Sequence, residues 1–279
     1  MSATVMPVML WSLVLLGGAL GLAVGSFLNV VAYRLPIGGS LVSPPSACPG
    51  CGSGIRPYDN IPVLSWLVLR GRCRDCREPI SWRYPVIEAA TGVLFVVVAV
   101  AFLPEFSTRA PLPAAITLIA FLYLAAISVA LAVIDIDTHT LPNRIVLPAY
   151  AIGGALLGTA LILEGEWSRL VSAAVGCAAA FLFYLVLALA RPGGMGFGDV
   201  KLAGVLGLYL GSLGWAQLAI GVFAAFVLGG VFGIALTVTR RATRTSGIPF
   251  GPWMLAGAWL GILAGGPLWA GYLRLIGLG

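Results

Sequence analysis

The run LAGVLGLYLGSLGWAQLAIGVFAAFVLGGVFGIALTVT, residues 202–239, contains no charged side chain. A helix needs about 20 apolar residues to cross the hydrocarbon core of a bilayer. The run is therefore too long for one crossing, and we expect the stretch GSLGW, residues 211–215, to turn the chain between two helices. This part of the chain predicts a pair of membrane helices.

The composition of the whole chain points the same way. Hydrophobic residues make up 60% of it and charged residues 9%, and the mean hydropathy is +1.03. A soluble domain of this length needs more charge to hydrate its surface. A bilayer admits only helices or closed barrels, and the sequence lacks the apolar–polar alternation of barrel strands. The sequence therefore predicts an all-α polytopic membrane protein.

About eight transmembrane helices are predicted. Residues 1–33 carry no charge and Arg34 follows the apolar run, so we expect a retained first helix with its N-terminus outside rather than a cleaved signal peptide. Residues 34–84 form the only sizeable polar segment, and residues 85–279 hold the remaining helices. These helices are expected near 85–103, 114–134, 145–163 and 170–190, in two parts of 202–239, and from Pro252 to Leu273.

The net charge of +6 comes largely from arginines gathered in one segment. In a membrane protein this pattern indicates the cytoplasmic side, and no fold cue for nucleic-acid binding accompanies it. With segment 34–84 placed inside, residues 135–144, 191–201 and 240–244 also lie inside, and residues 104–111 and 164–169 lie outside. Seven of the fifteen arginines lie in this segment: Arg34, Arg56, Arg70, Arg72, Arg74, Arg77 and Arg83.

Two CxxC motifs, Cys48–Cys51 and Cys73–Cys76, are separated by 21 residues in the polar segment. Four thiolates with this spacing suit the tetrahedron that zinc prefers, and a loop with so little aliphatic core would gain folding free energy from the metal. Disulfides or free thiols are the alternative, although the loop is assigned to the reducing side. We expect a structural, ribbon-like Zn²⁺ site. Cys177, in an apolar run, is expected to be a packing residue.

Two acidic clusters lie beside predicted membrane helices. One contains Asp135 and Asp137, the other Asp199, and both fall on the predicted cytoplasmic face. Residues two apart point about 200° away from each other on a helix, so Asp135 and Asp137 are not expected to pair. One of them is expected to meet Asp199. Two nearby carboxylates share a proton, and such a dyad can add water to a peptide carbonyl.

The segment GMGFGDVKL, residues 194–202, surrounds Asp199 with glycines that would let another backbone approach. The alternative is that Asp199 only caps a helix beginning near Val200. Lys201 is interpreted as a charge at the membrane edge or a salt-bridge partner. His139, the single histidine, is interpreted as a loop residue near the site. Gly194, Gly196 and Gly198 are the glycines concerned.

Six motifs, in this order, resemble those of the type IV prepilin peptidases. They are GSFLNVVAYRLP (25–36), the paired CxxC motifs, RYPVIEAATG (83–92), DIDTHTLPN (135–143), GMGFGDVKL and IPFGPW (248–253). The resemblance runs from the first helix almost to the C-terminus. It implies a bifunctional aspartic protease of the bacterial inner membrane. Such enzymes remove the basic leader from type IV prepilins or type II secretion pseudopilins and then methylate the new N-terminal residue with S-adenosylmethionine.

The resemblance assigns roles to particular residues. Asp135 and Asp199 match the two catalytic aspartates, with Asp137 as a supporting carboxylate and Gly196 and Gly198 in the GxGD motif. Asn143 stands where many family members have Asp. The cysteine loop, residues 34–84, resembles the region associated with methylation, which makes residues 85–279 the peptidase core. Candidate methyltransferase residues are Gly71, Arg72 and Glu88, although Glu88 could instead pair with an arginine.

Two other classes of protein remain as alternatives. A proton-coupled transporter also buries carboxylates in a Gly-rich bundle, but it needs no CxxC pair and no two aspartates at one face. A zinc-dependent scaffold would tolerate asparagine at both aspartate positions. Prepilin or pseudopilin substrates and membrane lipid are the expected partners, and no nucleic acid is expected.

Overall fold

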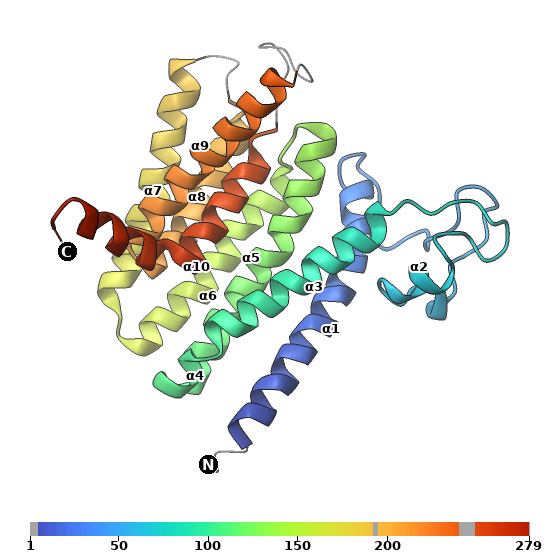
Figure 1. Ribbon diagram of the computed structural model, residues 1–279, viewed down its shortest axis with the longest axis horizontal. Coiled ribbons are helices and arrows are strands. Elements are labelled where there is room, and N and C mark those ends of the chain that lie inside the picture. The colour runs from blue at the N-terminus through green and yellow to red at the C-terminus, as the bar shows by residue number, and fades with distance from the viewer. Residues whose placement is uncertain (1–4, 192–194, 240–248, 279) are drawn as a thin grey trace. The chain divides into compact units, whose positions relative to one another are not determined.

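The computed structural model describes residues 5–191, 195–239 and 249–278 (Figure 1). Within these ranges the chain forms ten α-helices and one 3₁₀ turn, and the only β pairing is two isolated bridges. The long helices are α1 (Val5–Arg34), α3 (Arg83–Phe102), α5 (Pro111–Thr138), α6 (Asn143–Glu164), α7 (Trp167–Ala190), α8 (Phe197–Leu213), α9 (Trp215–Val238) and α10 (Gly251–Leu275). The short elements are η1 (Pro57–Asp59), α2 (Leu64–Val68) and α4 (Glu105–Thr108).

Seven of the long helices in the described ranges are long and apolar enough to cross a membrane. The eighth, α8, has 17 residues, one fewer than the 18 required of these seven helices. The predicted all-α polytopic architecture is confirmed. The predicted turn within 211–215 is also confirmed, because Gly214 separates α8 from α9 with a φ of 141° that favours glycine.

The predicted start of α8 is wrong. The sequence placed it near residue 202, or near Val200 if Asp199 is only a cap, but the helix begins at Phe197. Charge and glycine in its first turn lower the local hydropathy, so an apolar pattern alone places the boundary too late. Asp199 therefore lies inside the helix.

The chain divides into two compact units. Unit 1 comprises Met1–Thr108 and Phe121–Ala130, and unit 2 comprises Arg109–Ala120 and Leu131–Gly279. In unit 1, α1 packs antiparallel on α3 through glycines one turn apart: a methyl group at Gly21 would lie 2.7 Å from Phe95 Cβ, and one at Gly25 would lie 2.7 Å from Glu88 Cα. Small residues let membrane helices approach closely, and that contact stabilises the pair.

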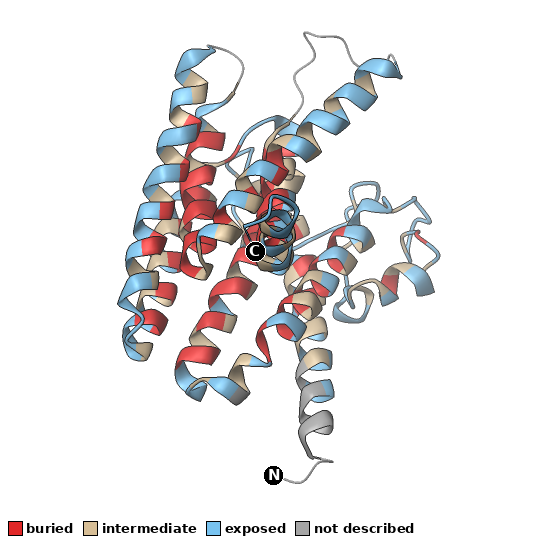
Figure 2. Cartoon of the chain, turned by 60° about the vertical axis from the view of Figure 1, so that its left-hand side comes forward, coloured by how far each residue is buried: buried red, intermediate tan, exposed pale blue. Residues whose placement is uncertain are grey.

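Helix α8 is the most buried helix of unit 2. Twelve of its 17 residues are buried, and burial in the chain is concentrated on helix faces, as Figure 2 shows. Its neighbour α7 packs against it through backbone, since a methyl group at Gly211 would lie 2.5 Å from the Ser172 carbonyl oxygen. From α6, the Tyr150 hydroxyl donates to the Lys201 carbonyl at 2.6 Å. Helix α8 is thereby held by α6 near its start and by α7 near its end.

Candidate active site and metal centre

Asp135 lies in the last turn of α5 and is 4% exposed. The helix continues past it and ends at His139, which adopts a left-handed conformation (φ 53°) and donates its N–H to the Asp135 carbonyl at 2.9 Å. The Asp135 carboxylate accepts a hydrogen bond from the backbone N–H of Gly251 at 3.0 Å. Because Gly251 is the first residue of α10, this bond joins the end of α5 to the start of α10.

Asp199 lies in the first turn of α8 and is 8% exposed. Its carboxylate accepts the Gly196 N–H at 3.1 Å, and its own N–H donates to the Gly196 carbonyl at 3.1 Å. An acidic side chain here satisfies an N-terminal donor and interacts favourably with the helix dipole. Asp199 therefore helps to cap its helix. This role is compatible with a role in an aspartyl dyad.

The two carboxylates belong to the same unit and lie close enough for their charges to interact. Leu141 packs against the start of α8, which carries Asp199, and against the start of α10, whose Gly251 binds Asp135: a methyl group at Gly198 would lie 3.1 Å from Leu141 Cβ, and one at Gly251 would lie 3.3 Å from Leu141 Cδ2. Glycine at both positions lets the start of α8 and the start of α10 approach Leu141. The arrangement gathers two acids from α5 and α8 beside the end of α10.

Asp137 has different surroundings. It is exposed, whereas Asp135, two residues earlier on the continuous helix, is buried. The predicted separation of these two side chains on α5 is therefore confirmed. Asp137 does not share the buried position of the two other aspartates.

Lys201 contacts α6 rather than an acidic partner. Its ammonium donates to the Asn143 side-chain oxygen and lies 5.2 Å from the centre of the Phe197 ring. It therefore ties the N-terminal part of α8 to the first residue of α6. Gly196 precedes α8 and Gly198 lies in its first turn, whereas Gly194 lies outside the described residues. His139 is exposed at the end of α5.

Three residues beside the aspartates were not singled out from the sequence: Gly251, Leu141 and Tyr184. Gly251 and Leu141 lie within the motifs IPFGPW and DIDTHTLPN, so a signal was present without an assignment. Tyr184 lies in an apolar run of α7 that carries no such signal. It is 2% exposed and close enough to Asp199 for the carboxylate charge to act on its hydroxyl.

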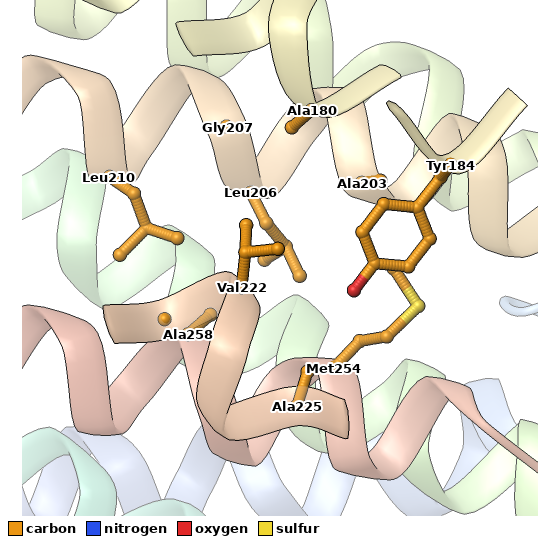
Figure 3. Close-up of a pocket in the computed structure, with 11 residues that line it drawn as sticks. Ala180, Tyr184, Ala203, Leu206, Gly207, Leu210, Val222, Ala225, Met254 and Ala258 are labelled. Atoms are coloured by element: carbon orange, nitrogen blue, oxygen red, sulfur yellow. The ribbon is translucent and has the colours of Figure 1, made fainter. Parts of the chain in front are cut away.

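Tyr184 also lines a cavity of about 10 Å³ inside unit 2, and Figure 3 shows its hydroxyl among the lining side chains. Its other walls are apolar or glycine, including Leu206, Val222 and Met254. A space of this size holds about one water molecule. The cavity is therefore not a place for a peptide substrate.

The four cysteines of the polar loop form a cluster. Their sulfur atoms all lie within 4.8 Å of one another, and Cys48 Sγ lies 3.7 Å from Cys76 Sγ, at hydrogen-bond distance and without a disulfide bond. Each CxxC sits in a tight turn: Cys48 N–H donates to the Ser53 carbonyl at 2.9 Å, and Cys73 N–H donates to the Glu78 carbonyl at 2.8 Å. In both turns a residue with positive φ, Gly52 or Arg77, follows the second cysteine. The turns are alike and face each other.

The cluster fits a tetrahedral zinc ion. Sulfur ligands about 2.3 Å from zinc lie about 3.8 Å from one another, close to the spacing observed. The Ser53 side chain and N–H lower the pKa of Cys51 to about 7. Against an opposing hydrogen bond from the Glu78 backbone, burial and the other three thiols raise the pKa of Cys76 to about 12. Four thiols this close therefore need a cation before all can be thiolates.

The three methyltransferase candidates all lie in unit 1, around α2. Gly71 is buried with a φ of 65°, and a methyl group there would lie 2.8 Å from the Trp66 ring. Arg72 is exposed. Glu88 is buried and accepts the Val63 N–H at 2.7 Å. Gly71 therefore lies after the end of α2, and Glu88 holds its start.

Comparison with known proteins gives two separate family matches along the chain. Residues 19–102 match the bacterial peptidase A24 N-terminal domain, and residues 122–234 match the type IV leader peptidase family. A prepilin leader peptidase/N-methyltransferase of Aeromonas salmonicida is 35% identical over 97% of this chain and 96% of its own length. The chain belongs to the type IV leader peptidase family.

Other members are equally similar along their length. Proteins with the same name from Pseudomonas putida and Burkholderia pseudomallei are 34% and 37% identical, over 94% and 90% of this chain and 94% and 85% of their own lengths. No solved structure shows significant similarity to it. The N-terminal match contains all four cysteines, and the leader peptidase match contains Asp135 and Asp199. Gly251 lies beyond the end of both matches, and its contact with Asp135 comes from the structure.

Proposed function

We propose that this family member cleaves the leader peptide of type IV prepilins or type II secretion pseudopilins and then methylates the new N-terminus. The observation that carries the proposal is the burial of Asp135 and Asp199, from separate helices of one unit, at interacting distance. The names of relatives that align along nearly the whole chain support the same activity.

The two carboxylates perform the hydrolysis together. One holds a proton and the other, ionised, takes a proton from a water molecule. The water oxygen bonds to the scissile carbonyl carbon while the protonated carboxyl donates to the carbonyl oxygen. The carbon–nitrogen bond then breaks as the leaving amine takes up the proton held by the base. The carbonyl re-forms as one hydroxyl of the intermediate returns its proton to the other carboxylate. The Gly251 and Gly196 N–H groups hold the carboxylates in place during these transfers.

The remaining assignments belong to the same proposal. Residues 34–84 form a cytoplasmic loop, and Cys48, Cys51, Cys73 and Cys76 hold a structural Zn²⁺. Because four thiolates leave the ion no open position, its contribution is to fold the loop. S-adenosylmethionine supplies the methyl group, with Gly71, Arg72 and Glu88 as candidate contacts. Asp137, Gly196, Gly198 and Lys201 support the peptidase core, residues 85–279. The enzyme works in the bacterial inner membrane.

The test is cleavage of a co-reconstituted prepilin by wild type and three single variants, with S-adenosylmethionine present and the N-terminus read by mass spectrometry. We expect Asp135→Asn and Asp199→Asn each to lower the cleavage rate by at least about 10³-fold, because each removes one partner in proton transfer. Asp137→Asn is the matched control, and we expect it to cleave within about threefold of wild type.

Wild type is also expected to add one methyl group to the cleaved product. Cleavage that persists in both the 135 and 199 variants would eliminate the dyad. An unmethylated product from wild type would mean that the cysteine loop has a role other than methyl transfer.

A further inference from the structure

The short helix α2, Leu64–Val68, presents an apolar face to the surroundings. Leu64, Leu67 and Val68 are 60%, 57% and 75% exposed and occupy positions i, i+3 and i+4 of one helix face. Ile61, 47% exposed, precedes the helix. Large apolar side chains clustered on a polar loop mark an interaction site.

The opposite face of α2 is fastened to the cysteine loop. Ser65 is buried, and its hydroxyl donates to the Tyr58 carbonyl at 3.0 Å. The Trp66 indole N–H donates to the Ile80 carbonyl at 3.0 Å. The helix therefore cannot turn its apolar face inward without breaking these bonds.

The start of α2 is also fastened to a membrane helix. Glu88 accepts the Val63 N–H, and Val63 adopts a φ of 62° that is unfavourable for a β-branched residue. Glu88 lies five residues after Arg83, the first residue of α3, which is about 7.5 Å along the helix axis. Because α3 is one of the candidate spans, its first turns mark the membrane border. Glu88 therefore holds α2 at the level of that border.

Positive charge follows the apolar face directly. Arg70 and Arg72 are exposed, and no acidic residue occurs between positions 60 and 74. Arg74 is bound to Asp59, but among the described residues no ion pair involves Arg70 or Arg72. An apolar face beside unpaired arginines is the pattern of a helix that lies in the interface of an anionic membrane.

We propose that α2 is an interfacial helix that docks the cysteine loop onto the bilayer crossed by α3. Leu64, Leu67 and Val68 enter the boundary between headgroups and acyl chains, and Arg70 binds the phosphates of anionic lipid. The occupant of the face is lipid, because α2 is attached to α3 at the depth where lipid headgroups begin. The inference does not depend on either enzymatic activity.

Photo-crosslinking of the full-length protein in nanodiscs tests the proposal. A benzoylphenylalanine residue replaces Leu67 or Val68, and the nanodiscs contain phosphatidylethanolamine with about 30% phosphatidylglycerol, near the anionic content of a membrane that attracts basic segments. The matched control carries the same probe at Ile55, an apolar residue of this loop that is 46% exposed and lies outside α2. We expect lipid adducts at 67 and 68 at least about fivefold more often than at 55.

A second experiment tests the charged part. With the probe at position 68, we expect Arg70→Gln to lower the yield of phosphatidylglycerol adducts at least about twofold, with Arg77→Gln as the control. Unchanged thermal unfolding of each variant shows that it is folded. Adducts to a supplied prepilin or to a second copy of the chain, or equal lipid yields at 55 and 68, overturn the docking. If the yield of lipid adducts depends neither on phosphatidylglycerol nor on Arg70, the role of anionic lipid is overturned.

Discussion

The two buried aspartates are held by different means. Asp199 accepts an N–H from Gly196, three residues away, whereas Asp135 accepts one from Gly251, 116 residues away. The position of Asp199 therefore depends on local helix geometry. The position of Asp135 depends on how α10 packs, so substitutions far from α5 in the sequence can disturb it.

Gly251→Ala tests this dependence. A methyl group at Gly251 would lie 2.7 Å from the Asp135 carboxylate oxygen, so the carboxylate must move although the N–H remains. We expect kcat for prepilin cleavage to fall about 10- to 100-fold, as for a catalytic group displaced by about 1 Å, with KM little changed. The measurement is steady-state cleavage in proteoliposomes.

The control for this variant is Gly271→Ala on the same helix, where no atom lies within 4 Å of the added methyl group. It should keep wild-type kinetics. Equal kcat values for the two alanine variants would show that Gly251 does not position Asp135.

For single residues, the sequence predicts the acidic side chains better than the groups that contact them. A carboxylate beside apolar helices is costly, so Asp135 and Asp199 are conspicuous in a chain with ten acidic residues. The hydrogen bond from Gly251 could not be predicted, because it joins segments 116 residues apart through a backbone N–H, which every residue except proline possesses. Tyr184 could not be predicted either, since an aromatic residue in an apolar helix is most often packing.

Among the elements, α7 and α8 approach most closely through glycine. A methyl group at Gly207 would overlap the Gly176 carbonyl oxygen and lie 2.7 Å from Ala180 Cβ. Neither neighbour is the end of a flexible side chain, so the helices themselves must separate.

Gly207→Ala is therefore expected to destabilise the protein by about 1–3 kcal/mol, the usual cost of overpacking. Thermal unfolding in detergent measures the loss. Gly230→Ala on α9 is the matched control, since an added methyl group there meets open space. If both variants unfold at the wild-type temperature, the α7–α8 contact is looser than described.

The cysteine turns give a prediction about metal. With Cys51→Ser the site loses one of four ligands, and we expect less zinc per chain and at least about 100-fold faster hydrogen exchange at the Cys48 and Cys73 backbone N–H groups. Prepilin cleavage should stay within about twofold of wild type, because Asp135 and Asp199 belong to the other unit.

Cys177→Ser provides the comparison, because Cys177 lies on α7, outside the cluster. Unchanged exchange in the Cys51 variant would mean that the turns fold without metal. Loss of cleavage equal to the loss of zinc would mean that the loop serves proteolysis as well.

The elements that the sequence predicted best are those bounded by strong breaks. Gly214 ends α8 and Gly165 ends α6, both at positive φ. The start of α8 was placed too late because Gly198, Asp199 and Lys201 look like a loop when hydropathy alone is read. Their helical conformation depends on the hydrogen bond between Asp199 and Gly196 and on the contact of Lys201 with Asn143.

For the molecule as a whole, the family matches and the two units place the cysteines and the aspartates in different parts of the chain. Both parts are predicted to face the cytoplasm. Reporter fusions test this: alkaline phosphatase fused after residue 165, between α6 and α7, is expected to be active, and the same enzyme fused after residue 60 is expected to be inactive.

A fluorescent protein that matures only in the cytoplasm, fused at the same two points, should give the reverse pattern. The opposite result for both reporters would invert the orientation. Activity of alkaline phosphatase at both points would refute the assignment of the arginine-rich loop to the inside.

The hydrogen bond that Asp199 makes at the start of α8 has a consequence for the history of the family. A lineage that no longer met its substrate would still gain helix stability from an acidic residue there. Asp135 brings no such benefit, because asparagine could accept the Gly251 N–H without burying a charge. Decay of an abandoned site should therefore begin at the aspartate of α5. A GxGD motif that survives alone would be the relic of an enzyme, preserved by folding after selection for catalysis had ended.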